Sequence, residues 1–185
     1  MAFIGTLAPH KAPHLLLGAW GRLAVDLRAR ATLEIFGPAQ HDPSYQAQLG
    51  VLAADVGAVL RGALTRETVA TELADIDLLV VPSVWFENSP LVILEALALR
   101  TPVLVSAIGG MAELVEPGVS GEHFAVGDVD DLARVLAGLL STPQRLAACY
   151  ATDEPIKDVA QDARQIEELY FDALAATRAD AGRDP

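Results

Sequence analysis

The sequence predicts an α/β fold built on a Rossmann-like, doubly wound parallel sheet with helices on both faces. Apolar runs of strand length alternate with helical patterns through the first 150 residues, and this alternation is typical of parallel sheets with right-handed crossovers. Hydrophobic residues make up 52% of the 185-residue chain but aromatic residues only 5%, so Ala, Leu and Val must build most of the core. Such a composition favours strands that are covered on both faces.

The apolar runs define the expected elements in chain order. The predicted strands are Ala2–Leu7, Thr32–Phe36, Ala58–Arg61, Leu78–Val81, Val103–Ser106 and Glu122–Phe124. The predicted helices between them are His14–Arg30, Ser44–Val56, Arg66–Leu73, Pro90–Leu99, Met111–Val115 and Val129–Leu140. From Asp158 to Arg178 apolar residues recur at helical spacing, which predicts one further long helix.

The change of pattern after Pro155 divides the chain. We predict a Rossmann-like domain over residues 1–150, a C-terminal helical extension over residues 151–178 and a disordered tail over residues 179–185, which is polar and carries no pattern. Because a strand begins almost at the first residue, we expect the chain to be one domain of a longer protein.

Composition excludes several classes of function. The net charge of −12, from 25 acidic and 13 basic residues, repels phosphate backbones and argues against a nucleic acid partner. The single cysteine, Cys149, excludes an internal disulfide and a multi-cysteine metal site. No apolar run approaches the roughly 20 residues that span a bilayer, and the start does not resemble a signal peptide. We therefore predict a cytoplasmic protein.

In open α/β sheets the ligand lies beyond the carboxyl ends of the strands, so the loops that follow strands are the candidate sites. The first loop runs from Gly5 to Pro13. Gly5 allows close backbone approach, and Lys11 lies near a helix N-terminus where it could pair with a phosphate. The alternative is that Lys11 is a solvated loop residue. His10 and His14 are expected to be exposed rather than ligands.

The second loop, from Pro82 to Pro90, follows the strand with the strongest apolar pattern. Ser89 would suit the N-cap and Pro90 the first helical position. Glu95 interrupts an otherwise apolar helix, so we expect it near the protein interior, where an ionised carboxylate requires hydrogen bonds. Either Glu95 and Glu87 are functional, or Glu95 caps a neighbouring loop and Glu87 is merely exposed.

The third loop, from Ala107 to Val115, contains the paired glycines Gly109 and Gly110. They permit a tight turn and close passage of a ligand, but paired glycines also serve ordinary turns. The three-glycine dinucleotide fingerprint is absent, which argues against an NAD-dependent dehydrogenase. The sequence also lacks a Walker loop, a nucleophile elbow and a histidine pair at metal-ligand spacing.

Taken in order, these motifs resemble the C-terminal, donor-binding domain of the retaining GT-B glycosyltransferases, known as group 1 or family four. The most specific feature is a pair of glutamates, Glu87 and Glu95, eight positions apart. The other matching motifs are Pro82-Ser83, Asn88, Pro90, Ala96, Thr101-Pro102-Val103, Gly109-Gly110 with Glu113, Gly118 with Gly121, Gly127-Asp128 and Leu132-Ala133. The resemblance implies one half of a GT-B architecture and covers about residues 3 to 140.

The resemblance also implies roles for individual residues. As catalytic residues, Lys11 would contact the diphosphate of the donor and Glu87 the hydroxyls of the transferred sugar. Glu95 would bind the ribose. Further substrate-binding residues would be Gly5, Thr6, Arg61, Leu64, Asn88, Ser89, Pro90, Leu91 and Val92. Neither a metal nor a cofactor is expected, since the nucleoside-diphosphate sugar is itself a substrate.

Two positions depart from the family pattern. Thr6 replaces a phosphate-binding arginine and Ala12 replaces the glycine after the lysine. Loss of a bidentate cation weakens stabilisation of the departing diphosphate, unless Arg66 or a residue of another domain substitutes for it.

The function implied by the resemblance is donor binding for hexosyl transfer to an unidentified acceptor, held mainly by an N-terminal GT-B domain. The isolated chain would then be inactive or nearly so. The full-length enzyme is a candidate for peripheral attachment to the inner membrane face. One alternative is a sugar-nucleotide epimerase of the same architecture, and another is a non-catalytic module with a decayed nucleotide site.

Overall fold

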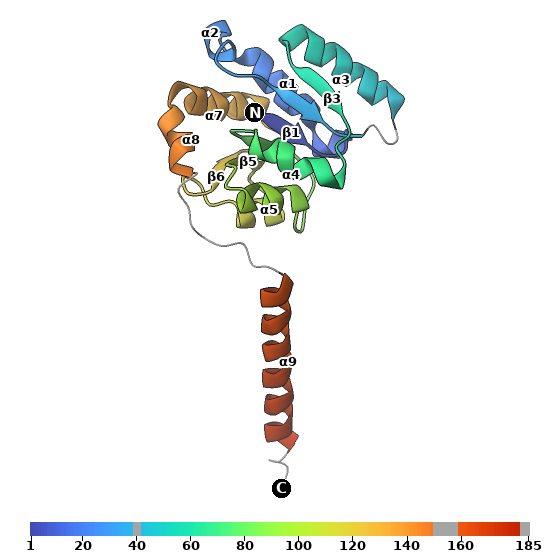
Figure 1. Cartoon of the computed structure of the whole chain (residues 1–185), viewed down its shortest axis with the longest axis vertical. Coiled ribbons are helices and arrows are strands. Elements are labelled where there is room, and N and C mark those ends of the chain that lie inside the picture. Colours follow the sequence, from blue (N-terminus) through green and yellow to red (C-terminus); the bar gives the residue numbers. More distant parts are fainter. Residues whose placement is uncertain (39–41, 150–158, 182–185) are drawn as a thin grey trace. The chain divides into compact units, whose positions relative to one another are not determined.

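The computed structural model of the chain describes residues 1–38, 42–149 and 159–181, and it confirms the predicted α/β class. The chain divides into two compact units, residues 1–153 and 154–185. In the first unit a six-stranded parallel sheet has the order β3-β2-β1-β4-β5-β6 (Figure 1). The strands are β1 (Ala2–Ile4), β2 (Glu34–Phe36), β3 (Val59–Gly62), β4 (Leu79–Val81), β5 (Val103–Ser106) and β6 (Gly121–Phe124).

Helices connect these strands in sequence. Those of the first unit are the 3-10 turn η1 (Pro9–Lys11) and the α-helices α1 (Pro13–Arg22), α2 (Val25–Arg28), α3 (Pro43–Val56), α4 (Arg66–Ala74), α5 (Leu91–Ala98), α6 (Gly109–Leu114), α7 (Val129–Ser141) and α8 (Pro143–Cys149). The second unit contains α9 (Val159–Ala181). The turn η1 and the helix α8 were not predicted from the sequence.

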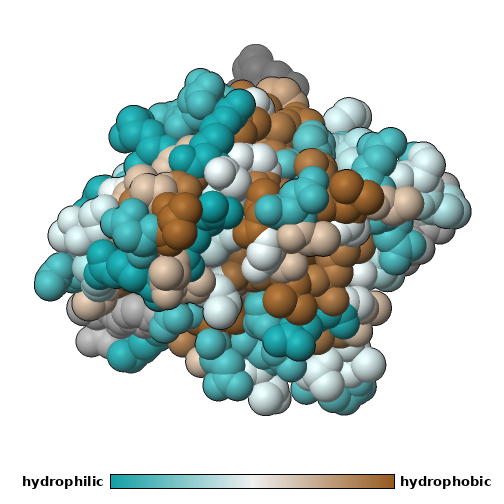
Figure 2. Space-filling view, turned by 90° about the horizontal axis from the view of Figure 1, so that it is seen from above, coloured by the Kyte–Doolittle hydropathy of each residue, from teal (hydrophilic) through white to brown (hydrophobic). Residues whose placement is uncertain are grey.

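The core lies on both faces of the sheet because neighbouring strand residues point to opposite sides. One face packs against α1, α3 and α7 through Phe3, Ile35, Val80, Leu104, Leu16, Leu49 and Leu136. The other face packs against α4, α5 and α6 through Leu79, Val81, Val103, Val105, Leu73, Ile93 and Met111. Hydrophobic residues also reach the surface, and Figure 2 shows them between hydrophilic residues on the face seen from above.

The strand order reverses between β1 and β4, which are parallel neighbours with Ala2 opposite Leu79. The loops that follow these two strands therefore leave the sheet side by side at its carboxyl edge. A reversal of this kind is the place where open α/β sheets bind ligands. The topology thus brings the Lys11 loop and the Glu87 loop together, although they are 76 residues apart in the chain.

All six helices predicted in the first unit differ from the structure by at least one residue at an end, and two of these differences have a clear local cause. The single helix predicted over His14–Arg30 is wrong, because α1 ends at Arg22 and α2 begins at Val25. Leu23 between them is extended, with φ −68° and ψ 144°, and its side chain is buried in the core. The helix predicted from Pro90 begins at Leu91, with Pro90 at the N-cap position that was predicted for Ser89.

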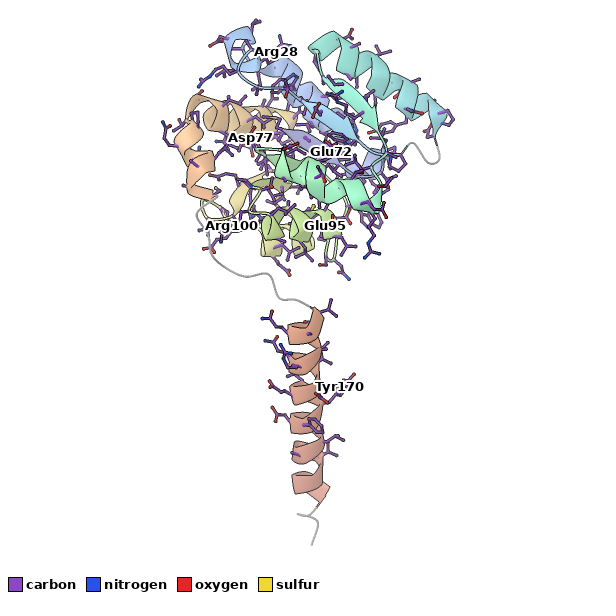
Figure 3. All side chains as sticks on the ribbon, in the orientation of Figure 1. Arg28, Glu72, Asp77, Glu95, Arg100 and Tyr170 are labelled. Carbon is purple, nitrogen blue, oxygen red and sulfur yellow. The ribbon has the colours of Figure 1, made fainter. Side chains whose placement is uncertain are left out.

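The long C-terminal helix confirms a predicted element, but it ends later than expected. The prediction of disorder from residue 179 is wrong for residues 179–181, which belong to α9, whereas residues 182–185 lie outside the described residues. The predicted helix start at Asp158 and the predicted domain boundary at residues 150 and 151 also lie outside them. Tyr170 projects from α9 and is 68% exposed (Figure 3). Among the described residues, no helix combines the length and apolar character needed to cross a membrane.

The expectation that His14 is exposed is wrong, because its side chain is half-buried, and this burial gives the fold a predicted dependence on pH. Its Nδ1 lies 2.7 Å from the Tyr45 hydroxyl, and burial lowers the pKa of His14 below its ordinary value of 6.5. Burial likewise raises the pKa of Tyr45 to about 12. Because the folded state holds fewer protons on His14 than the unfolded state does, this contribution to stability is complete above about pH 6.5 and is lost as the pH falls through the lowered pKa.

We expect the melting temperature of the wild-type chain to fall more steeply between pH 7 and pH 5 than that of His14→Gln, which cannot take up this proton. Equal slopes for the wild type and His14→Gln would show that His14 does not contribute to the pH dependence.

Candidate functional site

Hydrogen bonds join the loop after β1 to the loop after β4. The Ser83 hydroxyl donates to the carbonyl oxygen of His10 at 3.0 Å, and the backbone N–H of Val84 donates to the same oxygen at 2.9 Å. Ser83 is fully buried, so water does not compete for these bonds. The two loops are thus fixed to each other immediately beside Lys11.

Lys11 and Glu87 form an ion pair at this junction. The Lys11 ammonium donates to Glu87 Oε1, and the Ser83 hydroxyl lies 3.1 Å from the same oxygen. The side chains of Lys11 and Glu87 are 29% and 15% exposed, so a ligand can reach both. Within residues 1–38 and 42–149, Glu87 Oε2 has no recorded hydrogen-bond or ion-pair partner. It can therefore accept a hydrogen bond from a bound hydroxyl.

Gly110, the second of the paired glycines, contacts the backbone of the loop that carries Glu87. The N–H of Gly110 donates to the Glu87 carbonyl oxygen at 2.9 Å. A Cβ atom on Gly110 would lie only 1.8 Å from the carbonyl oxygen of Asn88, so no other residue fits without moving that backbone. The close contact that a glycine permits at this position is therefore with the backbone of residues 87 and 88.

Ala12 stands where the family pattern described above has glycine. The backbone conformation at this position explains why glycine suits it. Ala12 is left-handed, with φ 55° and ψ 40°, where it ends η1 and precedes α1. This conformation is readily adopted by glycine and costs other residues about 1 kcal/mol. The turn that presents Lys11 is therefore kept even with alanine at this position.

Glu95 does not lie in the interior, so that expectation is wrong. It is exposed on α5 (Figure 3). Of the apolar residues in this helix only Ile93 and Ala96 are buried, while Leu91 is 71% exposed. The apolar run therefore overstated how much of α5 is covered. An exposed carboxylate on this helix is nevertheless accessible to a ligand.

The other predicted site residues lie in loops at the carboxyl edge of the sheet, in β3 or at the start of α5. Gly5 and Thr6 are half-buried after β1, Asn88 and Ser89 are exposed after β4, and Pro90 and Val92 are half-buried at the start of α5. Arg61 is engaged elsewhere, because its Nε donates to Glu34 at 2.7 Å. Leu64 packs against the small cluster of Ala2, Phe36 and Ile76.

Two large aromatic side chains are exposed immediately before Glu87. Trp85 is 63% exposed and Phe86 73%, and the Trp85 ring lies edge-on to His10 with 6.4 Å between ring centroids. Exposed aromatic area beside a polar site is typical of binding surfaces. Among the described residues, no group of three or more His, Cys, Asp or Glu side chains is arranged to hold a metal ion.

Sequence reasoning did not assign a site role to Ser83. Its only signal was the Pro82-Ser83 motif, which indicated a family but not a contact. The hydroxyl becomes informative only when the parallel order of β1 and β4 places His10 beside it.

The family model described as "Glycosyl transferases group 1" matches residues 1–153. The chain belongs to this glycosyltransferase family. The D-inositol 3-phosphate glycosyltransferase of Mycobacterium avium (strain 104) is 36% identical over 152 residues, which cover 80% of this chain and 35% of that protein. Its namesake from Thermobispora bispora is 34% identical over 187 residues, covering 94% and 43%. This glycosyltransferase chain thus spans less than half the length of these curated relatives.

Solved structures similar to this group 1 chain include Alr3699/HepE of Anabaena in complex with UDP. That structure has a TM-score of 0.72 and 26% identity, and the match covers 81% of this chain and 41% of HepE. The HepE complex with UDP-glucose matches with a TM-score of 0.72 and 25% identity over the same shares. The sucrose-phosphate synthase of Thermosynechococcus elongatus has a TM-score of 0.72 at 23% identity, covering 95% and 45%, and shows the same fold.

Proposed function

We propose that this chain is the donor-binding domain of a retaining glycosyltransferase that takes a UDP-sugar and transfers a hexosyl unit. The Lys11–Glu87 ion pair at the carboxyl edge of the sheet carries the proposal. It combines a cation for a diphosphate with a carboxylate for sugar hydroxyls, in a family of sugar transferases. The HepE complexes with UDP and UDP-glucose support this choice of donor.

In this proposal the diphosphate lies between Lys11 and the start of α5. The N–H groups of the first helical turn have no partner four residues earlier in the helix, and the helix dipole attracts negative charge at this end. Leu91 and Val92 can donate there, whereas Pro90 has no N–H. Stabilising the departing diphosphate in this way requires no metal ion.

The remaining predicted contacts complete the donor site. Glu87 would accept hydrogen bonds from the sugar through Oε2, Glu95 would bind the ribose, and Arg61 and Leu64 would flank the base. Thr6 supplies no cation, so Arg66, which is exposed at the first position of α4, or a residue of another domain would compensate for the missing arginine.

The acceptor would be bound mainly by an N-terminal domain of the whole enzyme, and the isolated chain would transfer nothing at a useful rate. Membership in a transferase family favours transfer over the epimerase alternative. The cytoplasmic location, with the whole enzyme peripheral to the inner membrane face, stays a prediction.

Calorimetric titration of the chain with UDP, GDP and ADP, and with their glucose conjugates, tests the proposal. We expect heat from UDP and UDP-glucose at micromolar to millimolar concentrations. A folded chain that binds none of the six would favour the non-catalytic alternative, and preferential binding of GDP or ADP would correct the assignment of the base.

Changing Glu95 to glutamine is expected to weaken UDP binding by about 1–3 kcal/mol, because charged hydrogen bonds to the ribose would be lost. Titration with UDP measures this effect. The exposed Glu116, in the loop before β6, is the matched control, since Glu116→Gln should bind UDP like the wild type. Unchanged UDP affinity in Glu95→Gln would exclude Glu95 from the ribose site.

A further inference from the structure

We propose that Ser83 is the positioning residue for sugar recognition: its buried hydroxyl fixes one oxygen of Glu87 so that the other faces the transferred sugar. The inference rests on the proposed function, because it takes Glu87 as the carboxylate that meets the sugar. Ser83 itself would touch no substrate atom.

The hydroxyl of Ser83 lies at the centre of three polar contacts. It can donate to the His10 carbonyl oxygen at 3.0 Å or to Glu87 Oε1 at 3.1 Å, and it accepts from the N–H of Trp85 at 3.3 Å. A hydroxyl has one proton and two lone pairs, so the two acceptors share that proton. The shared proton couples the backbone beside Lys11 to the carboxylate of Glu87.

Lys11 alone cannot fix the direction of the Glu87 carboxylate. Its ammonium is a point charge on a flexible stem with freely rotating donors, and the side chain is partly exposed. Ser83 has a single rotatable side-chain bond, is fully buried and lies in the loop two residues after the end of β4. A short side chain that is locked by packing holds a partner in a narrower range of positions.

The two oxygens of Glu87 are consequently unequal. Oε1 takes both the Lys11 ammonium and the Ser83 hydroxyl, and Oε2 has no recorded partner among the residues that the structure describes. Without Ser83 the carboxylate would keep only its hydrogen bond from Lys11. It could then rotate and present either oxygen to the sugar. Recognition of the sugar would then lose the benefit of a preorganised acceptor.

The test compares the affinities for UDP and UDP-glucose of the 185-residue chain and its Ser83→Ala variant. We expect Ser83→Ala to lose roughly three- to tenfold more affinity for UDP-glucose than for UDP, the range of one hydrogen bond. A residue that only stabilised the fold would weaken both nucleotides alike, so this difference reports positioning. Ser83→Cys, whose thiol is a weak donor, should show the same selective loss and serves if Ser83→Ala does not fold.

Ser106 provides the matched control. It is also a fully buried serine at the carboxyl end of a strand, the neighbouring β5, but its hydroxyl has no hydrogen-bond partner among the described residues. Ser106→Ala should therefore leave the ratio of the two affinities unchanged.

Equal losses for UDP and UDP-glucose in Ser83→Ala, or no loss for either, would overturn the positioning role while leaving the proposed function intact. Failure of the folded wild-type chain to bind either nucleotide would instead refute the proposed function, and the role of Ser83 with it.

Discussion

Replacing Lys11 with alanine is expected to reduce the affinity of the chain for UDP by about 1.5–3 kcal/mol, roughly 10- to 100-fold. Two effects act in the same direction. The variant loses the cation at the diphosphate, and it leaves the Glu87 carboxylate without the ammonium that now neutralises it. An uncompensated carboxylate beside a diphosphate repels it, and the repulsion is stronger at a half-buried site than in water.

Calorimetric titration with UDP measures this loss. Arg22 is a suitable control, because it is a partly exposed cation that pairs with Asp130 at 3.0 Å at the end of α1, away from the loop that carries Lys11. Arg22→Ala should bind UDP as the wild type does. If Lys11→Ala also retained wild-type affinity, the diphosphate would have to lie elsewhere on the sheet edge.

The fold could be predicted because its signals are local. Most strands are short and mainly apolar, and Val103–Ser106 was predicted with the bounds that β5 has. The break at Leu23 was not predicted, although Gly21 lies two residues before it. The chain leaves the helix at Leu23, whose side chain is buried in the core, and that burial depends on tertiary structure.

The contacts within the candidate site could not be predicted from the sequence. Lys11 and Glu87 were assigned from motifs, whereas their ion pair depends on β1 and β4 being neighbours. The burial of Glu95 was predicted wrongly, because hydropathy alone does not show which side of an apolar helix faces the sheet. The contact between Gly110 and the backbone of Glu87 could not be predicted either, since the paired glycines fitted an ordinary turn equally well.

Changing Gly110 to alanine should disturb the site, although Gly110 itself is not among the proposed donor contacts. The added methyl would meet the Asn88 carbonyl oxygen at 1.8 Å and the Glu87 carbonyl oxygen at 2.9 Å. Both neighbours are backbone atoms, so the loop that carries Glu87 must move. We expect a loss of roughly 1–3 kcal/mol in the free energy of unfolding and a more than tenfold loss of affinity for UDP-glucose, since misplacement by about 1 Å is costly at a preorganised site.

The matched control separates this effect from the general cost of a methyl group. Gly50 lies within α3, and a Cβ there would meet nothing closer than Leu60 Cδ1 at 4.0 Å. Gly50→Ala should therefore stabilise the chain by about 0.5–1 kcal/mol through helix propensity and leave UDP-glucose binding unchanged. Urea unfolding and titration of both variants measure the two quantities. If Gly110→Ala kept wild-type affinity, the Glu87 backbone would not need its contact with α6, and the orientation of the carboxylate would depend on Lys11 and Ser83 alone.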